Sequence, residues 1–284
     1  MGIVKVVTDF DNTVTEEKGL EPFFEAYSRR FCVELGVSEA QYKNAIATVR
    51  RDMEAEPLKY GWKHNGFFSA PVTGDPIGSN TVAHIELMHR VMRGELPNLE
   101  VGNIPADESA VLDLKEKCYL EAYPQRHTFF RDGAAGYLNA LESMFPEYAA
   151  IMSNSKDTSI RKKLDGLSGL EADLHLIGLA QKMVVNSEDG QVQPDGFPVP
   201  INPDRQEYLG NLKGFHPELR ELAVIGDNFF LDVATVLLHG GYGILLKTEA
   251  TQGYEVPFLE AHPRGHFARN YDSALKFLEQ HQER

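Results

Sequence analysis

The apolar and polar positions of this chain change their period along its length. Residues 3–8 read IVKVVT, a β-branched run that predicts a short buried strand, and polar residues follow it at once. Between residues 16 and 123 the apolar positions recur at helical spacing, with no convincing strand pattern. From residue 124 onward, short apolar runs alternate with helical patterns, which is typical of a parallel sheet covered by helices.

This order predicts two domains. The first is discontinuous, residues 1–15 and 124–284, and forms an α/β core with a doubly wound parallel sheet. The second is a smaller, all-helical domain, residues 16–123, inserted after the first strand. We expect further strands at residues 148–152, 174–179, 222–225 and 242–247, a hairpin over residues 182–192, and helices at residues 133–144, 157–164, 204–212, 229–238 and 272–280.

Composition narrows the classes of partner. A net charge of −14 repels nucleic acid and anionic lipid, so we expect neither as a partner. Both cysteines, Cys32 and Cys118, fall on the apolar stripes of predicted helices, which indicates buried thiols. The first residues lack a signal-peptide pattern, and no apolar run is long enough to span a bilayer. We therefore expect a cytoplasmic protein without a membrane partner, and the pattern carries no indication of its oligomeric state.

Polar side chains follow three of the predicted strands. These strand ends read TDFDNTVT from residue 8, MSNSKD from residue 152 and VIGDNFFLD from residue 224. Since ligands bind at the carboxyl ends of parallel strands, we expect Asp9, Asp11, Ser153 and Asp227 to surround one point. Several carboxylates repel one another unless a cation lies among them. Mg²⁺ suits a small all-oxygen site that also takes a substrate phosphate.

These motifs resemble those of the haloacid dehalogenase superfamily of phosphotransferases. The family's first motif, a strand followed by DxDx[TV], is similar to residues 9–13, DFDNT. Its second, a strand that ends in Ser or Thr, is similar to Ser153, and its fourth, GDxxxD or GDxxxxD, to Gly226, Asp227 and Asp232. The resemblance covers residues 1–15 and about 124–284, and the insertion lies where the family has a helical cap. The phosphoserine-phosphatase-like branch is the most similar, on the segments DFDNTVT and AQKMVVNSEDGQV.

The resemblance implies a role for each residue at the strand ends. Asp9 would be the nucleophile that forms an aspartyl-phosphate, and Asp11 the general acid and base. Asp9, Asp227 and the backbone carbonyl of Asp11 would hold Mg²⁺, with Asp232 as a support or an occasional ligand. The Ser153 hydroxyl and the Asn154 backbone N–H would donate to the phosphate.

The sequence departs from the family at the third motif, a lysine near a helix start. No lysine occupies that position, where the chain reads NPDRQ from residue 202. We expect Arg205 to supply the positive charge at the phosphate, and Lys213 and Lys182 are the alternatives.

The implied activity is the hydrolysis of a small phosphorylated molecule. A phosphomutase of the same fold and a non-catalytic protein that binds a phosphorylated ligand stay open as alternatives. A dehalogenase is disfavoured, because a halide leaving group needs no proton and Asp11 is present to supply one.

Overall fold

The computed structural model describes residues 2–283, which form two compact units. The sheet unit consists of Met1–Glu16, Gly61–Gly74 and Phe130–Arg284, and the helical unit of Glu17–Tyr60 and Asp75–Phe129. This division differs from the predicted one chiefly at residues 61–74, which belong with the sheet although they lie inside the predicted helical insertion. Among the described residues, no helix is both long and apolar enough to cross a membrane.

The sheet unit is built on six parallel strands in the order β10-β9-β8-β1-β6-β7. β1 lies in the middle, where Thr8 is level with Ile151 of β6 on one side and Ile225 of β8 on the other. The doubly wound parallel sheet predicted from the alternating pattern is therefore confirmed. The strands are β1 (Lys5–Thr8), β6 (Ala149–Met152), β7 (His175–Ile177), β8 (Leu222–Gly226), β9 (Tyr242–Leu246) and β10 (Gly265–Ala268).

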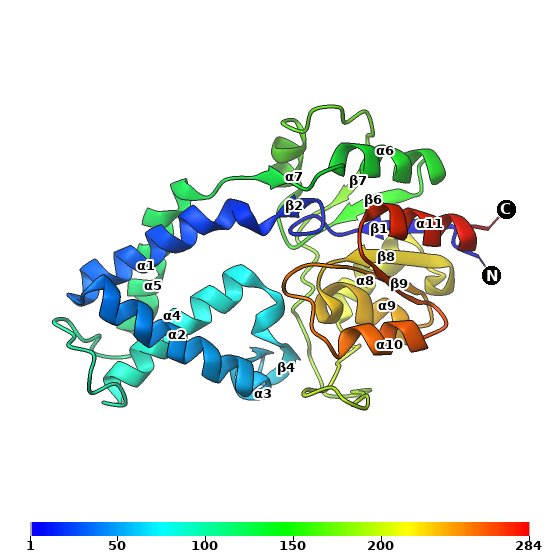
Figure 1. The fold of residues 1–284 in the computed structure, drawn as a ribbon. Helices are drawn as coiled ribbons and strands as arrows, with labels where there is room; N and C mark the ends of the chain where they lie inside the picture. Colours follow the sequence, from blue (N-terminus) through cyan, green and yellow to red (C-terminus); the bar gives the residue numbers. More distant parts are fainter. Residues whose placement is uncertain (1, 284) are drawn as a thin grey trace. The chain divides into compact units, whose positions relative to one another are not determined.

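Helices cover both faces of this sheet (Figure 1). Successive side chains of a strand point to opposite faces, so Val6 packs in one apolar cluster and Val7 in another. The first face is covered by α6 (Ala134–Met144), α7 (Asp157–Leu164) and α11 (Tyr271–His281). The second is covered by α8 (Gln206–Phe215), α9 (Ala234–Leu238) and α10 (Glu255–Ala261). The sequence pattern predicts neither α10 nor β10, which reads GHFA and contains no β-branched residue.

The helical unit contains the four helices that the 3.6-residue period predicts, and one short helix of four residues that it does not. Three of them begin at a side-chain cap, in which Ser38, Asp75 or Asp107 accepts a hydrogen bond from the backbone of the first turn. The helices are α1 (Glu21–Leu35), α2 (Glu39–Ala55), α3 (Pro57–Tyr60), α4 (Pro76–Met92) and α5 (Glu108–Ala122). Two-residue strands, β2 (Thr15–Glu16) and β5 (Phe129–Phe130), lie where the chain leaves and re-enters the sheet unit.

Two hairpin expectations are wrong. Residues 182–192 contain no strand, and Val192 forms only an isolated bridge with Ile201. A hairpin occurs instead at β3 (Trp62–His64) and β4 (Phe67–Ala70), where the sequence pattern predicts no strand. Its turn is Asn65-Gly66, with φ of 50° and 87°, a pair that favours the type I′ turn of two-residue hairpins.

Candidate active site at the strand ends

Asp9 follows β1 directly, at the point where the order of the strands reverses. The chain continues from β1 to β6 on one side and reaches β8 on the other only later, which is the position where open α/β sheets bind ligands. The Asp9 backbone N–H donates to the carbonyl of Ile225, 2.7 Å away, and only 7% of Asp9 is exposed. The predicted nucleophile is therefore a buried carboxylate at the switch point.

Two further carboxylates lie beside Asp9. Asp227 follows β8, Asp232 lies in a π-helix at Phe229–Val233, and oxygens of the three carboxylates lie within 4.8 Å of one another. Asp227 and Asp232 are five positions apart, which is the GDxxxxD form of the motif, and the wider π-helical turn accommodates the residue by which this form exceeds GDxxxD. Gly226 is required for this arrangement, since a Cβ there would lie 2.3 Å from Oδ2 of Asp232. We call Asp9, Asp227 and Asp232 the aspartate triad.

Burial and mutual repulsion oppose ionisation of the triad. The pKa of Asp9 is raised from 3.8 to about 7, chiefly by burial and further by the charges of Asp232 and Asp11, although Lys182 acts to lower it. Burial, with Asp9 and Asp232, also raises the pKa of Asp227 well above its ordinary value, against a hydrogen bond of 3.1 Å from Thr13. Carboxylates that repel in this way fit a divalent cation, which favours their ionised forms.

Lys182 supplies the cation beside Asp9. Its Nζ lies 2.5 Å from Oδ1 of Asp9 and 2.7 Å from Oδ1 of Asp232, and only 3% of Lys182 is exposed. Burial opposes its charge, but Asp232 and Asp9 raise its pKa above the ordinary value. Asp232 also accepts a hydrogen bond from the backbone of Asn228 at Oδ2, so both of its oxygens have donors. Because both oxygens of Asp232 already accept hydrogen bonds, Asp232 is better suited to hold Lys182 than to bind a metal ion, and Asp9 and Asp227 are the better metal ligands.

The expected phosphate contact of Arg205 is wrong. Arg205 precedes α8 and is completely buried, and its guanidinium donates to Ser69 and to the backbone carbonyl of Lys182. Lys213, the other alternative, is exposed in the last turn of α8. The sequence analysis favoured Arg205 over Lys182 because the family's lysine lies near a helix start. Lys182 lies in an irregular loop after β7, more than twenty residues before the predicted start of that helix.

Asp11 lies within reach of the end of β6. Its Oδ2 accepts hydrogen bonds from Ser153, 3.1 Å away, and Ser155, 2.7 Å away, and its Oδ1 lies 2.9 Å from Nζ of Lys163. The structure thus brings the predicted Asp11 and Ser153 into direct contact. Ser155 and Lys163, which the motifs do not mark, complete the set. Any role of Asp11 in proton transfer requires its carboxylate to exchange these partners for substrate.

The loops that carry these groups are held locally. Asn12 has a φ of 61°, in the left-handed region that Asn tolerates better than most residues, and its carbonyl accepts from Arg131. Asn154 is exposed, and its side chain accepts the backbone N–H of Lys182 at 2.9 Å. The loop that contains the predicted phosphate ligands therefore also fastens the loop that carries Lys182.

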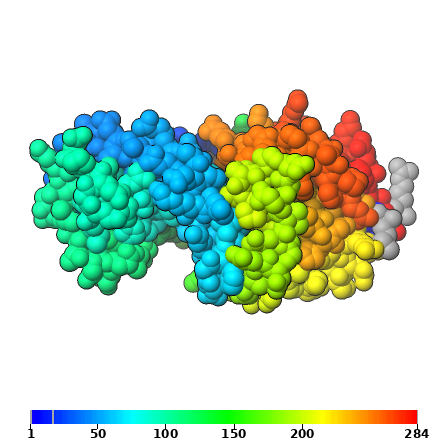
Figure 2. Space-filling model, turned by 90° about the horizontal axis from the view of Figure 1, so that it is seen from below, coloured from blue at the N-terminus to red at the C-terminus, as the bar shows by residue number. Residues whose placement is uncertain are grey.

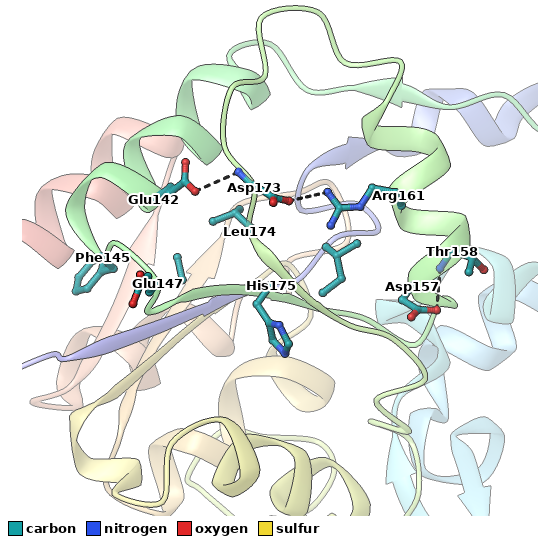
Figure 3. Close-up of a pocket in the computed structure, with 11 residues that line it drawn as sticks. Glu142, Phe145, Glu147, Asp157, Thr158, Arg161, Asp173, Leu174 and His175 are labelled. Carbon is teal, nitrogen blue, oxygen red and sulfur yellow. Dashed lines mark hydrogen bonds and ion pairs between the residues drawn. The ribbon is translucent and has the colours of Figure 1, made fainter.

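A separate cavity of about 550 Å³ lies between α6, α7 and the edge strand β7 (Figure 3). Figure 3 shows Asp173 between Glu142 and Arg161: its N–H donates to Glu142, and its carboxylate lies 3.0 Å from the Arg161 guanidinium. None of the residues that line this cavity belongs to the aspartate triad. Asp9, Asp227 and Lys182 are buried titratable groups with perturbed pKa values that lie together at the strand ends, so we assign the candidate active site there.

Comparison with known proteins agrees with this geometry at the level of the fold. No protein-family model matches the chain, and no curated protein is similar to it. A solved structure of a predicted phosphoglycolate phosphatase from Haemophilus somnus has a TM-score of 0.51 at 13% identity, over 96% of this chain and 97% of that chain. The solved structure of a conserved haloacid dehalogenase-like protein of unknown function from Agrobacterium tumefaciens has a TM-score of 0.50 at 16% identity, over 98% of this chain and 99% of that chain.

A haloacid dehalogenase-like family hydrolase from Xanthomonas campestris gives the same TM-score of 0.50, also at 16% identity, over 98% of this chain and 93% of that chain. These similarities extend over nearly the whole chain. The chain therefore has the fold of haloacid dehalogenase-like proteins, as the resemblance of its motifs predicts.

Proposed function

We propose that this protein is a magnesium-dependent phosphatase that hydrolyses a small-molecule phosphomonoester through an aspartyl-phosphate on Asp9. The observation that carries the proposal is the position of Lys182, which touches both Asp9 and Asp232 beside the third carboxylate, Asp227. A buried cation next to a buried carboxylate suits phosphoryl transfer, because it offsets charge on the nucleophile and on the transferring group.

In the first step an oxygen of Asp9 attacks phosphorus, and the bond from phosphorus to the substrate alkoxide breaks. The alkoxide takes a proton from the Asp11 carboxyl group, which acts in its protonated form and must first leave Ser153, Ser155 and Lys163. In the second step Asp11 removes a proton from water, the water oxygen attacks phosphorus, and the Asp9 carboxylate is released with inorganic phosphate. Splitting hydrolysis in this way replaces one difficult displacement by two easier ones.

The remaining groups bind and orient the phosphoryl group. Lys182 neutralises charge that develops on it, and the Ser153 hydroxyl and Asn154 N–H donate to its oxygens. Mg²⁺, held by Asp9, Asp227 and the backbone carbonyl of Asp11, would offset the repulsion between carboxylate and phosphate when bound. Asp232 keeps Lys182 in place. We expect this chemistry in the cytoplasm, on a substrate whose identity no residue of the site specifies.

Phosphate release from a panel of phosphorylated metabolites, in the presence of Mg²⁺, tests the proposal. Asp9→Asn removes the nucleophile with almost no change in shape and should abolish release, whereas Asp189→Asn, at an exposed turn, should not change it. Release that survives Asp9→Asn would exclude the mechanism. Transfer of the phosphoryl group within a sugar, without net release, would favour a phosphomutase. Binding of phosphorylated ligands without turnover would favour the non-catalytic alternative.

A further inference from the structure

Arg205 is a buried cation without a buried anion bonded to it. Its Nη1 donates to the Ser69 hydroxyl at 2.8 Å and to the Lys182 carbonyl at 2.5 Å, and its Nη2 donates to the Ser69 carbonyl at 2.5 Å. Within residues 2–283 it forms no ion pair, and its Nε is buried without a hydrogen-bond partner. Burial lowers the pKa of Arg205 to about 10, so the side chain stays protonated at neutral pH. A charge buried among neutral acceptors is costly, which indicates a role beyond packing.

The backbone of Lys182 is fastened on both sides. Its N–H donates to Oδ1 of Asn154 at 2.9 Å, and its C=O accepts from Arg205. The residues just before it adopt strained backbone, since Leu179 and Gln181 have φ of 53° and 52°. Each such residue costs about 1–3 kcal/mol and persists only where the surroundings enforce it. The direction of the Lys182 side chain therefore depends on the contacts that hold its backbone.

Ser69 connects this segment to the β3–β4 hairpin. Its hydroxyl accepts from Arg205 and donates to the carbonyl of Met183 at 2.7 Å, one residue beyond Lys182. The neighbouring residues Phe68 and Ala70 pack in the same apolar cluster as Phe197, Val199 and Ile201. Figure 2 shows the corresponding contact, with the blue-to-cyan segment of the hairpin alongside the yellow-green segment that follows Lys182. The hairpin is thus part of the support behind the candidate active site.

We propose that Arg205 and Ser69 form a clamp on the backbone of Lys182 that aims its ammonium group at Asp9 and Asp232. Neither residue touches the aspartate triad by a hydrogen bond, so both are positioning residues that act through Lys182. The clamp explains why an irregular loop can present a lysine where the family's motif has one at a helix start. Its effect on turnover rests on the proposed function, whereas its effect on the position of Lys182 does not.

Substitutions that remove the clamp test the inference. Arg205→Met should lower kcat by about 10- to 100-fold with little change in KM, because displacing a catalytic group by about 1 Å costs up to about 100-fold. Ser69→Ala leaves the Ser69 carbonyl in place and should lower kcat by about 3- to 10-fold. Arg205→Lys keeps the charge and should fall between wild type and Arg205→Met. Leu278→Ala, a buried substitution on α11 in the apolar cluster on the other face of the sheet, controls for loss of stability and should keep the wild-type kcat.

A double variant separates positioning from an independent role. If Arg205 acts only through Lys182, adding Arg205→Met to Lys182→Met should lower kcat no further than Lys182→Met alone. A double variant whose loss of kcat equals the product of the two single losses would overturn the clamp. A folded Arg205→Met variant with wild-type kcat would overturn it as well. If Arg205→Met does not fold, the same comparison is made with Ser69→Ala.

Crystal structures of the variants test the clamp without any substrate. We expect the Lys182 ammonium to lose its contact with Asp9 or Asp232 in Arg205→Met, and to be displaced less in Ser69→Ala. A Lys182 that still lies within hydrogen-bond distance of both carboxylates in Arg205→Met would contradict the inference. This result stands even if the wild-type protein releases no phosphate from any substrate, an outcome that would remove the proposed function alone.

Discussion

The Nζ atom of Lys182 lies 2.5 Å from Oδ1 of Asp9, although 173 positions separate the two residues in the chain. This contact places a cation against the predicted nucleophile, in a chain that lacks the lysine of the third motif at its usual position. It also explains why the buried Asp9 can be present in its ionised form, since Lys182 opposes the effect of burial on its pKa.

Replacing Lys182 by Met should lower kcat for phosphate release by about 100- to 1000-fold, because a group that stabilises developing charge in a buried site contributes that much. Lys213→Met is the matched control: Lys213 was an alternative candidate, is exposed on α8 and should be replaceable without effect. The measurement is steady-state phosphate release with Mg²⁺ in excess. Equal losses in the two variants would contradict the role of Lys182.

Removing the charge of Asp227 should have opposite effects on metal binding and on stability. Asp227→Asn should weaken Mg²⁺ binding at least about tenfold, measured by calorimetric titration without substrate. In EDTA the same variant should be more stable than wild type, because burial and the neighbouring carboxylates make an ionised Asp227 unfavourable at neutral pH. Exposed Asp165 provides the control, since Asp165→Asn should change neither property.

In wild type, Mg²⁺ at about 100 times its dissociation constant should stabilise the fold by about 2.7 kcal/mol, which EDTA should reverse. Unchanged Mg²⁺ affinity in Asp227→Asn would rule out this carboxylate as a ligand.

Two serines that contact Asp11 should differ in their effect on phosphate binding. Ser153 is buried at the end of β6 and is the predicted phosphate donor, whereas Ser155 contacts Asp11 from the following loop. A hydrogen bond to a charged group contributes about 1.5–3 kcal/mol, so Ser153→Ala should weaken the affinity for inorganic phosphate by about 10- to 150-fold. Ser155→Ala should weaken it less than about threefold. The inhibition constant of inorganic phosphate measures the affinity of each variant. A larger loss of affinity in Ser155→Ala than in Ser153→Ala would identify Ser155 as the phosphate donor.

His84 should make the stability of the helical unit depend on pH. Its ring is buried in α4, with Nδ1 2.7 Å from the Asn80 carbonyl and Nε2 3.2 Å from the Ser28 hydroxyl. Burial lowers the pKa of His84 from 6.5 to about 3, so the folded unit favours the neutral ring. The stability should be complete above pH 6.5 and decline as the pH falls towards 3, because the unfolded chain then binds a proton that the folded chain does not.

The expected loss between pH 6.5 and 5 is at most about 2 kcal/mol, measured by urea unfolding followed by circular dichroism. Exposed His127 is the control, and His127→Gln should keep the pH dependence of wild type. A His84→Gln variant that folds should lose this dependence; if it unfolds with the wild-type pH profile, another group is responsible.

The strand ends could be predicted from sequence because each depends on local pattern. The run before Asp9 and the run before Asp227 are both apolar and β-branched, so each reads as a buried strand, and parallel strands bring their ends to one edge. Alternation of strands and helices was likewise enough for the doubly wound sheet. The helical period was enough for α1, α2, α4 and α5, but it predicted neither the four-residue α3 nor the β3–β4 hairpin.

The sequence by itself determined that Asp9 and Asp227 gather at the sheet edge, whereas only the tertiary structure decided that Asp232 joins them and which cation reaches them. Arg205 stands where spacing along the chain favours a phosphate ligand, yet its guanidinium turns inward to the Lys182 carbonyl. Lys182 lies in an irregular loop, where no period relates sequence position to direction. Its side chain is aimed by Asn154, Ser69 and Arg205, residues distant in the chain, and contacts of that kind form only when the elements pack together.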